Sequence, residues 1–154
     1  MKKQNFDSNR NQKAVIVLCI IIIISLAINV IQFFAFSLVK VRGNSMSPTY
    51  QSGDYIIVNK IESNISRNDV VMLYYNGNKI IKRIVGVEGD CIEMRKSQLY
   101  INGLLDLKPG DFDYSNFSYI LSENEFFVVG DNYEHSYDSR NFGRVMKKDI
   151  IGVV

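Results

Sequence analysis

The strongest constraint on the fold of this chain is an uncharged segment near its amino terminus, residues 14–39 (AVIVLCIIIIISLAINVIQFFAFSLV). About 20 apolar residues in a helix cross the hydrocarbon core of a bilayer, so this segment can span a membrane even when tilted. One alternative is a helix buried in a soluble core, but a domain this small could hardly cover every face of such a helix. The other is a cleaved secretory signal with Ala35-Phe36-Ser37 as its small-residue motif, but the apolar core of such a signal runs to only about 7–15 residues. We therefore expect an uncleaved transmembrane anchor over residues 14–39.

The charges that flank this segment predict its orientation. More basic residues precede it than follow it, and cytoplasmic flanks carry the excess of Lys and Arg. The preceding residues are Lys2, Lys3, Arg10 and Lys13, and the following ones are Lys40 and Arg42. We therefore predict a single-pass protein of the cell membrane, in contact with lipid. Residues 1–13 would form a cytoplasmic tail and residues 40–154 an extracytoplasmic domain.

Charge and cysteine content exclude several classes of partner and cofactor. The net charge of +2 is too small to indicate a nucleic-acid-binding surface. Cys19 lies within the predicted span and Cys91 outside it, so the two cannot pair, and the single histidine, His135, completes no zinc motif. We expect no metal, no other cofactor and no intramolecular disulfide.

From residue 53 onward the hydrophobic pattern has the period of strands. Asn76-Gly77 is a strong signal for a tight hairpin between two of them. The predicted strands are 54–58, 69–75, 79–87, 91–94, 98–101, 104–105 and 125–129. Short, evenly spaced strands favour a mainly β domain built from a coiled or closed sheet. A small excursion from it is expected at about residues 91–125, of which 106–124 are polar and irregular.

The polar segment GNSMSPTY, residues 43–50, follows the apolar run closely and contains two serines. A serine hydroxyl is a weak nucleophile unless a base lies within hydrogen-bond reach. The candidates are His135 and a lysine whose pKa is lowered by burial in apolar surroundings. Lys82 suits the second role because it lies within a β-rich run, on the same face as Ile80 and Ile84. The alternative is that Lys82 is a charge on an edge strand, which prevents aggregation.

Three segments, in order along the chain, together resemble the type I signal peptidase family, in a compact form similar to its Gram-positive members. Residues 43–49 (GNSMSPT) resemble the nucleophile motif of the family, and residues 82–90 (KRIVGVEGD) resemble its lysine motif. Residues 130–143 (GDNYEHSYDSRNFG) resemble its third motif, GDN followed by S-x-D-S-R and G. Each match alone would be weak, but all three in family order are specific. They outweigh the edge-strand alternative for Lys82.

The resemblance implies a Ser-Lys dyad. Ser45 would attack the scissile carbonyl, and neutral Lys82 would take its proton. The Ser45 backbone N–H would bind the oxyanion, without a side-chain donor at Gly43. The implied supporting roles are orientation of Lys82 by Ser136 and an ion pair between Asp138 and Arg140 with Ser139 nearby. The residues implied to line the pocket for a small substrate residue are Met46, Tyr50, Ile80 and Ile81. Tyr50 and Tyr133 depart from the usual family residues.

These features predict a membrane-bound serine endopeptidase that cleaves signal peptides from exported preproteins. An enzyme dedicated to pilin substrates is a variant of this function that the sequence leaves open. An alternative is a signal-peptidase-like pilus assembly factor without a working dyad, but both dyad residues are present. A self-cleaving Ser-Lys repressor is a third reading, and it conflicts with the predicted membrane span and the lack of a basic DNA-reading helix. We expect His135 to be a solvated loop residue.

Overall fold

The computed structural model describes residues 2–62, 64–107 and 114–154. The chain divides into two compact units, Met1–Phe36 and Ser37–Val154. Each unit is described by itself below.

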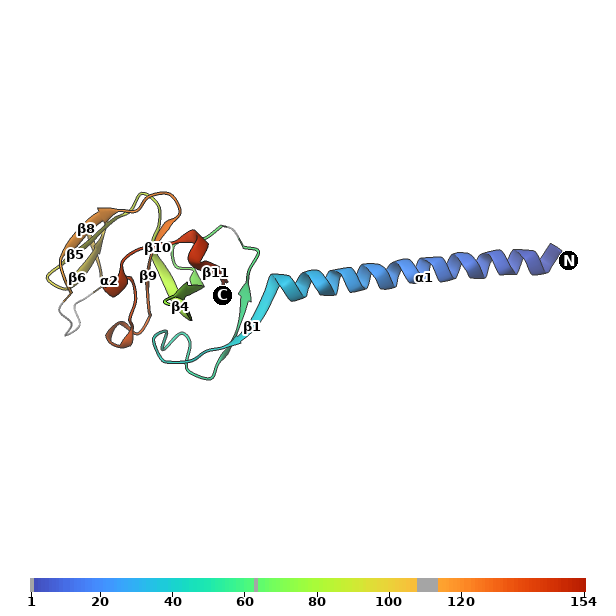
Figure 1. The fold of residues 1–154 in the computed structure, drawn as a ribbon, viewed down its shortest axis with the longest axis horizontal. Coiled ribbons are helices and arrows are strands. Elements are labelled where there is room, and N and C mark those ends of the chain that lie inside the picture. The colour runs from blue at the N-terminus through green and yellow to red at the C-terminus, as the bar shows by residue number, and fades with distance from the viewer. Residues whose placement is uncertain (1, 63, 108–113) are drawn as a thin grey trace. The chain divides into compact units, whose positions relative to one another are not determined.

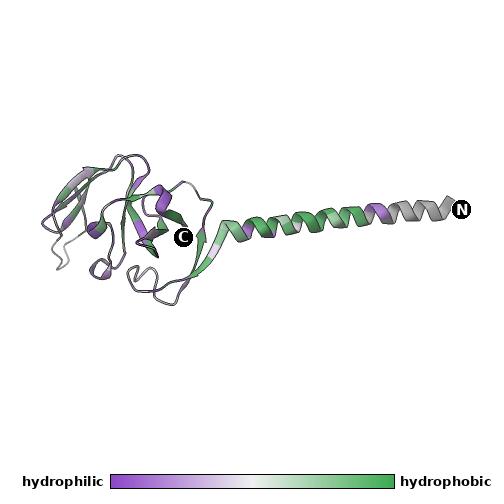
Figure 2. Ribbon diagram, viewed as in Figure 1, coloured by the Kyte–Doolittle hydropathy of each residue, from purple (hydrophilic) through white to green (hydrophobic). Residues whose placement is uncertain are grey.

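The first unit is formed by one helix, α1 (Lys2–Ala35). Its segment Val15–Ala35 is long and apolar enough to cross a membrane, and Figure 2 colours most of that segment as hydrophobic. The Asn29 side chain donates a hydrogen bond to the backbone carbonyl of Ser25 over 2.7 Å. The membrane span itself stays a prediction.

The helix ends before the predicted anchor does. Residues 14–39 were expected to be helical throughout, but β1 (Phe36–Lys40) begins directly after Ala35. The reason is long-range, because β1 pairs with β2 (Tyr55–Asn59), which lies more than a dozen residues further on. Backbone pairing with that strand decides a boundary that hydropathy alone could not place.

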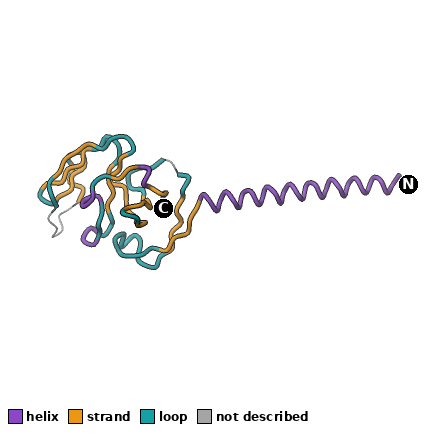
Figure 3. The backbone as a smooth tube through the Cα atoms, in the orientation of Figure 1, coloured by secondary structure: helices purple, strands orange, loops and turns teal. Residues whose placement is uncertain are grey.

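The second unit is mainly β, as predicted, and Figure 3 shows strands and loops with only short helical turns. Its larger sheet has seven strands in the order β1-β2-β11-β3-β4-β9-β10 (Figure 1). The further members are β3 (Val70–Tyr75), β4 (Asn78–Gly86), β9 (Glu125–Val129), β10 (Val145–Met146) and β11 (Ile150–Val153). The carboxyl-terminal strand β11 lies between β2 and β3 and was not predicted. Its residues are apolar enough for a strand, but its partners are distant in the sequence.

The predicted hairpin at Asn76-Gly77 joins β3 to β4. Both turn residues have positive φ, 46° at Asn76 and 77° at Gly77, as a tight two-residue hairpin requires. Along the hairpin Val71 lies opposite Lys82. On its other side β4 pairs with β9 only from Arg83 onward, so the first half of β4 has one unpaired edge.

A second sheet of four strands has the order β7-β6-β5-β8. Its members are β5 (Cys91–Arg95), β6 (Gln98–Ile101), β7 (Leu104–Leu107) and β8 (Phe117–Ile120). It accounts for the predicted excursion, although within the range 106–124, which was expected to be irregular, residues 106–107 and 117–120 are strands. β8 forms there because Phe117 and Tyr119 alternate with exposed residues and pack near Phe127 of β9. Residues 108–113 of that range lie outside the described residues.

Candidate active site

The nucleophile segment is an ordered turn between β1 and β2. Gly43 has φ +84°, a conformation that favours glycine, and the chain then turns through Asn44. The Ser47 N–H donates to the Asn44 carbonyl over 3.1 Å, and the Tyr50 N–H donates to the Met46 carbonyl over 2.9 Å. The Met46 side chain is buried beneath the turn, with 1% of its surface exposed. These contacts hold Ser45 at the surface of the domain, where a substrate can reach it.

Lys82 lies directly against this turn. Its Nζ and the Ser45 Oγ are joined by a hydrogen bond of 2.7 Å. Lys82 is 3% exposed, and this burial lowers its pKa below the usual value for lysine. Asp138 and Asp131 oppose the lowering of the pKa by their negative charge, and Arg140 adds to it. The pairing predicted from the three motifs is therefore present, and Lys82 is not a solvated edge-strand charge.

The loop after β9 binds the backbone on either side of Ser45. The Asn132 N–H donates to the Ser45 carbonyl over 3.0 Å, and the Asn132 side chain donates to the Asn44 carbonyl over 3.1 Å. At Gly130 a Cβ atom would lie 2.4 Å from the Ser45 carbonyl oxygen and 2.2 Å from the Ser136 Oγ. Only glycine therefore allows the loop to approach Ser45 this closely.

Asp131 connects three segments that are far apart in the sequence. Arg83 donates to it from Nε and Nη2 over 2.8 and 2.6 Å, and Thr49 donates through its hydroxyl over 2.5 Å. Burial raises the pKa of this carboxyl, but the bonds from Arg83 and Thr49 outweigh burial and hold the pKa below the usual range. No role was predicted for Asp131, Asn132 or Thr49. The position of Asp131 and Asn132 within the GDN motif was the sequence feature that could have indicated a role at the site.

Behind Lys82 lies the predicted ion pair of Asp138 and Arg140. Arg140 donates from Nε and Nη2 to the two carboxylate oxygens, each over 2.8 Å, and Asp138 is completely buried. Asp138 also accepts from the Gly130 N–H over 3.0 Å, and the buried Ser139 hydroxyl accepts from the Val128 N–H over 3.0 Å. The pair thereby holds the loop to the end of β9. Asp138 is also the N-cap of the short helix α2 (Ser139–Phe142).

The contact made by the Ser136 side chain differs from the predicted one. Its Oγ is buried and has no hydrogen-bond partner among the described residues, so the expected bond to Lys82 is not formed. The hydroxyl lies instead against the backbone at Gly130. Its position beside the site agrees with the prediction, but its contact does not.

The backbone N–H of Ser45 is free to bind an oxyanion. Among the described residues no acceptor lies within hydrogen-bond reach of it. Gly43 contributes no side-chain donor nearby, as expected from its residue type. A single backbone donor is therefore available beside the Ser45 hydroxyl.

An open groove of about 670 Å³ contains both members of the dyad and lies along β1 and the unpaired half of β4. Ile80 and Ile81 line it as predicted, together with Leu38, Val39 and Met72.

Met46 and Tyr50 are not among the lining residues. Met46 points into the interior. Tyr50 packs against the buried cluster that contains Val41, Ile56 and Val58. Neither side chain lines the groove, so the predicted contact of Met46 and Tyr50 with substrate stays a prediction.

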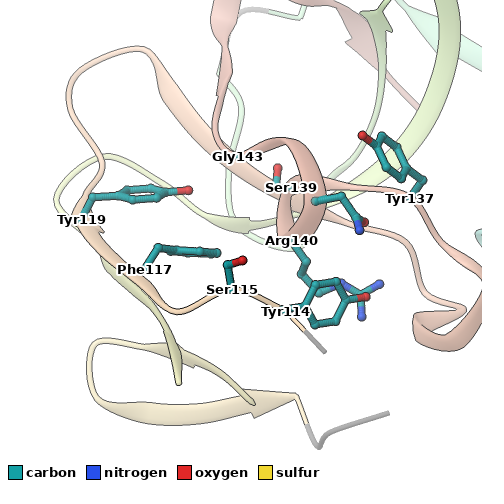
Figure 4. A pocket seen from close by; sticks show the side chains of 9 residues that line it. Tyr114, Ser115, Phe117, Tyr119, Tyr137, Ser139, Arg140 and Gly143 are labelled. Atoms are coloured by element: carbon teal, nitrogen blue, oxygen red, sulfur yellow. The ribbon is translucent and has the colours of Figure 1, made fainter. Parts of the chain in front are cut away.

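A second cavity, of about 500 Å³, lies beside α2 (Figure 4). Its walls include Arg140 and the aromatic rings of Tyr114, Phe117, Tyr119 and Tyr137. Burial raises the pKa of Tyr119 to about 12. Neither Ser45 nor Lys82 lines this cavity, so it is separate from the dyad.

His135 is exposed, as predicted, and its ring nitrogen lies 3.4 Å from the Asn132 side-chain oxygen. The side chain that forms a hydrogen bond with the Ser45 hydroxyl is Lys82, not His135. Among the described residues no group of three His, Cys, Asp or Glu side chains is arranged to hold a metal ion.

Comparison with known proteins agrees with this geometry. The family described as "Signal peptidase, peptidase S26" matches residues 13–154. The chain is 35% identical to signal peptidase I V of Bacillus subtilis over 136 residues, which cover 75% of this chain and 81% of that protein. It is 32% identical to signal peptidase IB of Staphylococcus aureus over 139 residues, which cover 74% of this chain and 73% of that protein.

Among solved structures, a signal peptidase I from Enterococcus faecalis is similar, with 27% identity, a TM-score of 0.48, and coverage of 60% of this chain and 97% of the other. The family match extends over nearly the whole chain and includes every motif described above. The chain belongs to the signal peptidase family of serine endopeptidases, peptidase S26.

Proposed function

We propose that this protein removes signal peptides from exported preproteins with Ser45 as nucleophile and Lys82 as general base. The observation that carries the proposal is the 2.7 Å hydrogen bond between Lys82 Nζ and Ser45 Oγ, made by a lysine whose burial favours the neutral amine. A neutral amine at hydrogen-bond distance can take the serine proton as the oxygen attacks.

The reaction then has two halves. Ser45 Oγ attacks the scissile carbonyl while its proton passes to Lys82, and the oxyanion accepts a hydrogen bond from the Ser45 N–H. The Lys82 ammonium protonates the leaving amine, which departs and leaves an acyl-enzyme ester on Ser45. Lys82, neutral again, takes a proton from water as the water oxygen attacks the ester. It returns that proton to Ser45 when the signal peptide carboxylate leaves.

Asp138, Arg140 and Ser139 act as positioning residues in this proposal. Their bonds to Gly130, Val128 and one another hold the loop that binds Asn44 and Ser45. The Arg83–Asp131 pair adds a second connection, because Arg83 follows Lys82 and Asp131 binds Thr49 of the nucleophile turn.

The substrate is proposed to bind as an added strand. The first half of β4 has an unpaired edge, and β1 is the outer strand of the sheet. An extended peptide in the groove can pair with these edges while its small side chains lie against Ile80 and Ile81. Pilins that carry a signal peptide would be substrates of the same kind. No observation favours the alternative of a pilus assembly factor without a working dyad.

The anchor is proposed to keep the dyad close to the outer membrane face, with residues 1–13 in the cytoplasm. Ser45 follows Ala35 by ten residues, a length that spans at most about 36 Å even when fully extended. The end of the apolar core of a signal peptide emerges within that reach.

The test is cleavage of a preprotein with an Ala-x-Ala site by the full chain in detergent or lipid. Ser45→Ala and Lys82→Ala should each lower kcat by roughly 10³-fold or more, because the reaction loses its nucleophile or its base. Circular dichroism and thermal unfolding establish that each variant is folded. Comparable cleavage by wild type and either folded variant would overturn the dyad. No cleavage by the folded wild type would overturn the function.

A further inference from the structure

The groove that contains Ser45 has a basic rim. Lys40 and Arg42 come from β1 and the residues after it, and Lys79 comes from the start of β4. All three are exposed. The groove-lining residues of the described chain include no Asp or Glu.

None of these three cations has a carboxylate partner among the described residues. The Lys40 Nζ lies 5.6 Å from the centre of the Tyr55 ring, and the Lys79 Nζ lies 5.6 Å from the centre of the Tyr74 ring. A ring face attracts an ammonium group but leaves N–H donors unused. The rim therefore has positive charge and hydrogen-bond donors available for a ligand in the groove.

The spacing of the rim indicates which part of a substrate would meet it. Lys79 precedes Lys82 by three residues in one strand, which corresponds to about 10 Å. An extended substrate with its scissile carbonyl at Ser45 advances by the same rise per residue. A substrate residue two to four positions from the scissile bond then lies level with Lys79.

We propose that this rim makes the enzyme prefer preproteins with an acidic side chain two to four residues from the scissile bond. The acidic residue lies on the part of the substrate between β1 and β4. This inference rests on the proposed function, since it concerns the substrate of the same dyad. Each cation is solvated, so each contact is weak, but the rim charges act together on one bound side chain.

The experiment compares peptides with an Ala-x-Ala site that carry Glu, Gln or Lys at one position at a time. The positions lie two, three or four residues from the bond, on either side of it. The full chain is assayed in an uncharged detergent, so that no lipid headgroup competes for the rim. At one position at least, kcat/KM should fall in the order Glu, Gln, Lys, with Glu about threefold to tenfold above Gln at low salt. The ratio should approach one at about 0.5 M salt, where exposed charges are screened.

Charge reversal on the rim tests whether the rim causes the preference for acidic substrates. Lys79→Glu changes the rim charge from +3 to +1 and should bring the rates of the Glu, Gln and Lys peptides closer together at the preferred position. Lys79→Glu combined with Lys40→Glu changes it to −1 and should reverse the order, so that Lys substrates are cleaved faster than Glu substrates. Lys96→Glu is the matched control, because Lys96 is exposed in the turn between β5 and β6 of the other sheet and gives the same net charge. It should leave the order unchanged.

Equal kcat/KM for all three peptides at every position, at low salt, would overturn the inference and leave the proposed function intact. A preference that survives unchanged in Lys79→Glu, Lys40→Glu and Arg42→Glu would overturn it too. Failure of the wild type to cleave any peptide would count against the proposed function instead.

Discussion

The two sheets of the β domain bury different kinds of side chain. Around the seven-stranded sheet the buried residues include Lys82, Asp138 and Arg140, which form the proposed site. The buried cluster of the four-stranded sheet is made of apolar side chains such as Ile92, Leu99 and Phe127. Desolvated charges weaken a fold unless they are paired. The buried charges of the seven-stranded sheet therefore serve the proposed site, whereas the apolar cluster of the four-stranded sheet stabilises the fold.

Strand β9 connects the two regions. Phe126 and Val128 pack into a buried cluster of the seven-stranded sheet, while Phe127 and Val129 pack into the cluster of the four-stranded sheet. The strand leads directly into Gly130 and the loop that binds Ser45. The apolar second sheet thus supports the element that orders the buried charges of the first.

The largest difference between the regions should come from their buried aspartates. Asp138→Asn removes the charge from a pair in which both side chains are buried, and should lower the free energy of unfolding by about 3–5 kcal/mol. Asp90→Asn is the matched change, because Asp90 pairs with the half-exposed Arg67, and should cost only about 1–2 kcal/mol. Urea unfolding of the full chain in detergent measures both, and equal losses would contradict the contrast.

Two glycines provide a second comparison, in which steric contact alone is tested. Gly130→Ala would place a Cβ against the Ser45 carbonyl, so cleavage should fall by about 10–100-fold and stability by about 1–3 kcal/mol. Gly86→Ala would place a Cβ 2.7 Å from Ile92 Cδ1 and 2.9 Å from Leu121 Cδ1, which belong to the other core. It should cost a similar amount of stability with little change in kcat of the folded enzyme.

The readouts for this pair are kcat and the midpoint of thermal unfolding, measured on the same preparations. If Gly86→Ala lowers kcat as much as Gly130→Ala, the division between a functional and a stabilising region does not hold.

The pH dependence of stability should reveal Lys82. Its pKa is lowered in the folded chain, mainly by burial, and is about 10.4 in an unfolded chain. Between these two values the unfolded chain binds a proton that the folded chain has lost. Stability therefore rises with pH across that window, by at most about 1.4 kcal/mol per pH unit, and below the window the buried ammonium is a net cost.

Unfolding of wild type and Lys82→Met over a pH series isolates this contribution, because the rise should vanish in the variant. Lys96→Met, in the other sheet, should retain it. The cleavage rate of the wild type should rise with pH as Lys82 loses its proton. An essential base with the usual lysine pKa would contradict the buried-amine account.

The smallest effect is expected at His135. Its side chain is exposed and contacts Asn132 only at 3.4 Å, so His135→Ala should change kcat/KM by less than about twofold. Steady-state cleavage measures this directly. A loss as large as that of Ser45→Ala would mean that Lys82 is not the base.

Four features could be predicted without a structure: the apolar helix, the mainly β domain, the hairpin at Asn76-Gly77 and the pair Ser45 and Lys82. Hydropathy, period-two alternation and turn chemistry are local properties, and the three motifs are short enough to be read without a structure. The Asp138–Arg140 ion pair could also be predicted from the sequence, because its residues are only two positions apart.

Features that depend on distant partners could not be predicted from the sequence. β1 and β11 are strands because β2 and β3 pair with them, and β8 forms on the cluster around Phe127. Met46 is buried, Tyr50 packs against the cluster around Ile56, and the Ser136 hydroxyl lies against Gly130 without the bond to Lys82 that was inferred for it. The bonds of Asp131 to Arg83 and Thr49, like the close approach at Gly130, join segments dozens of residues apart. Such contacts arise from register and packing, which no local pattern encodes.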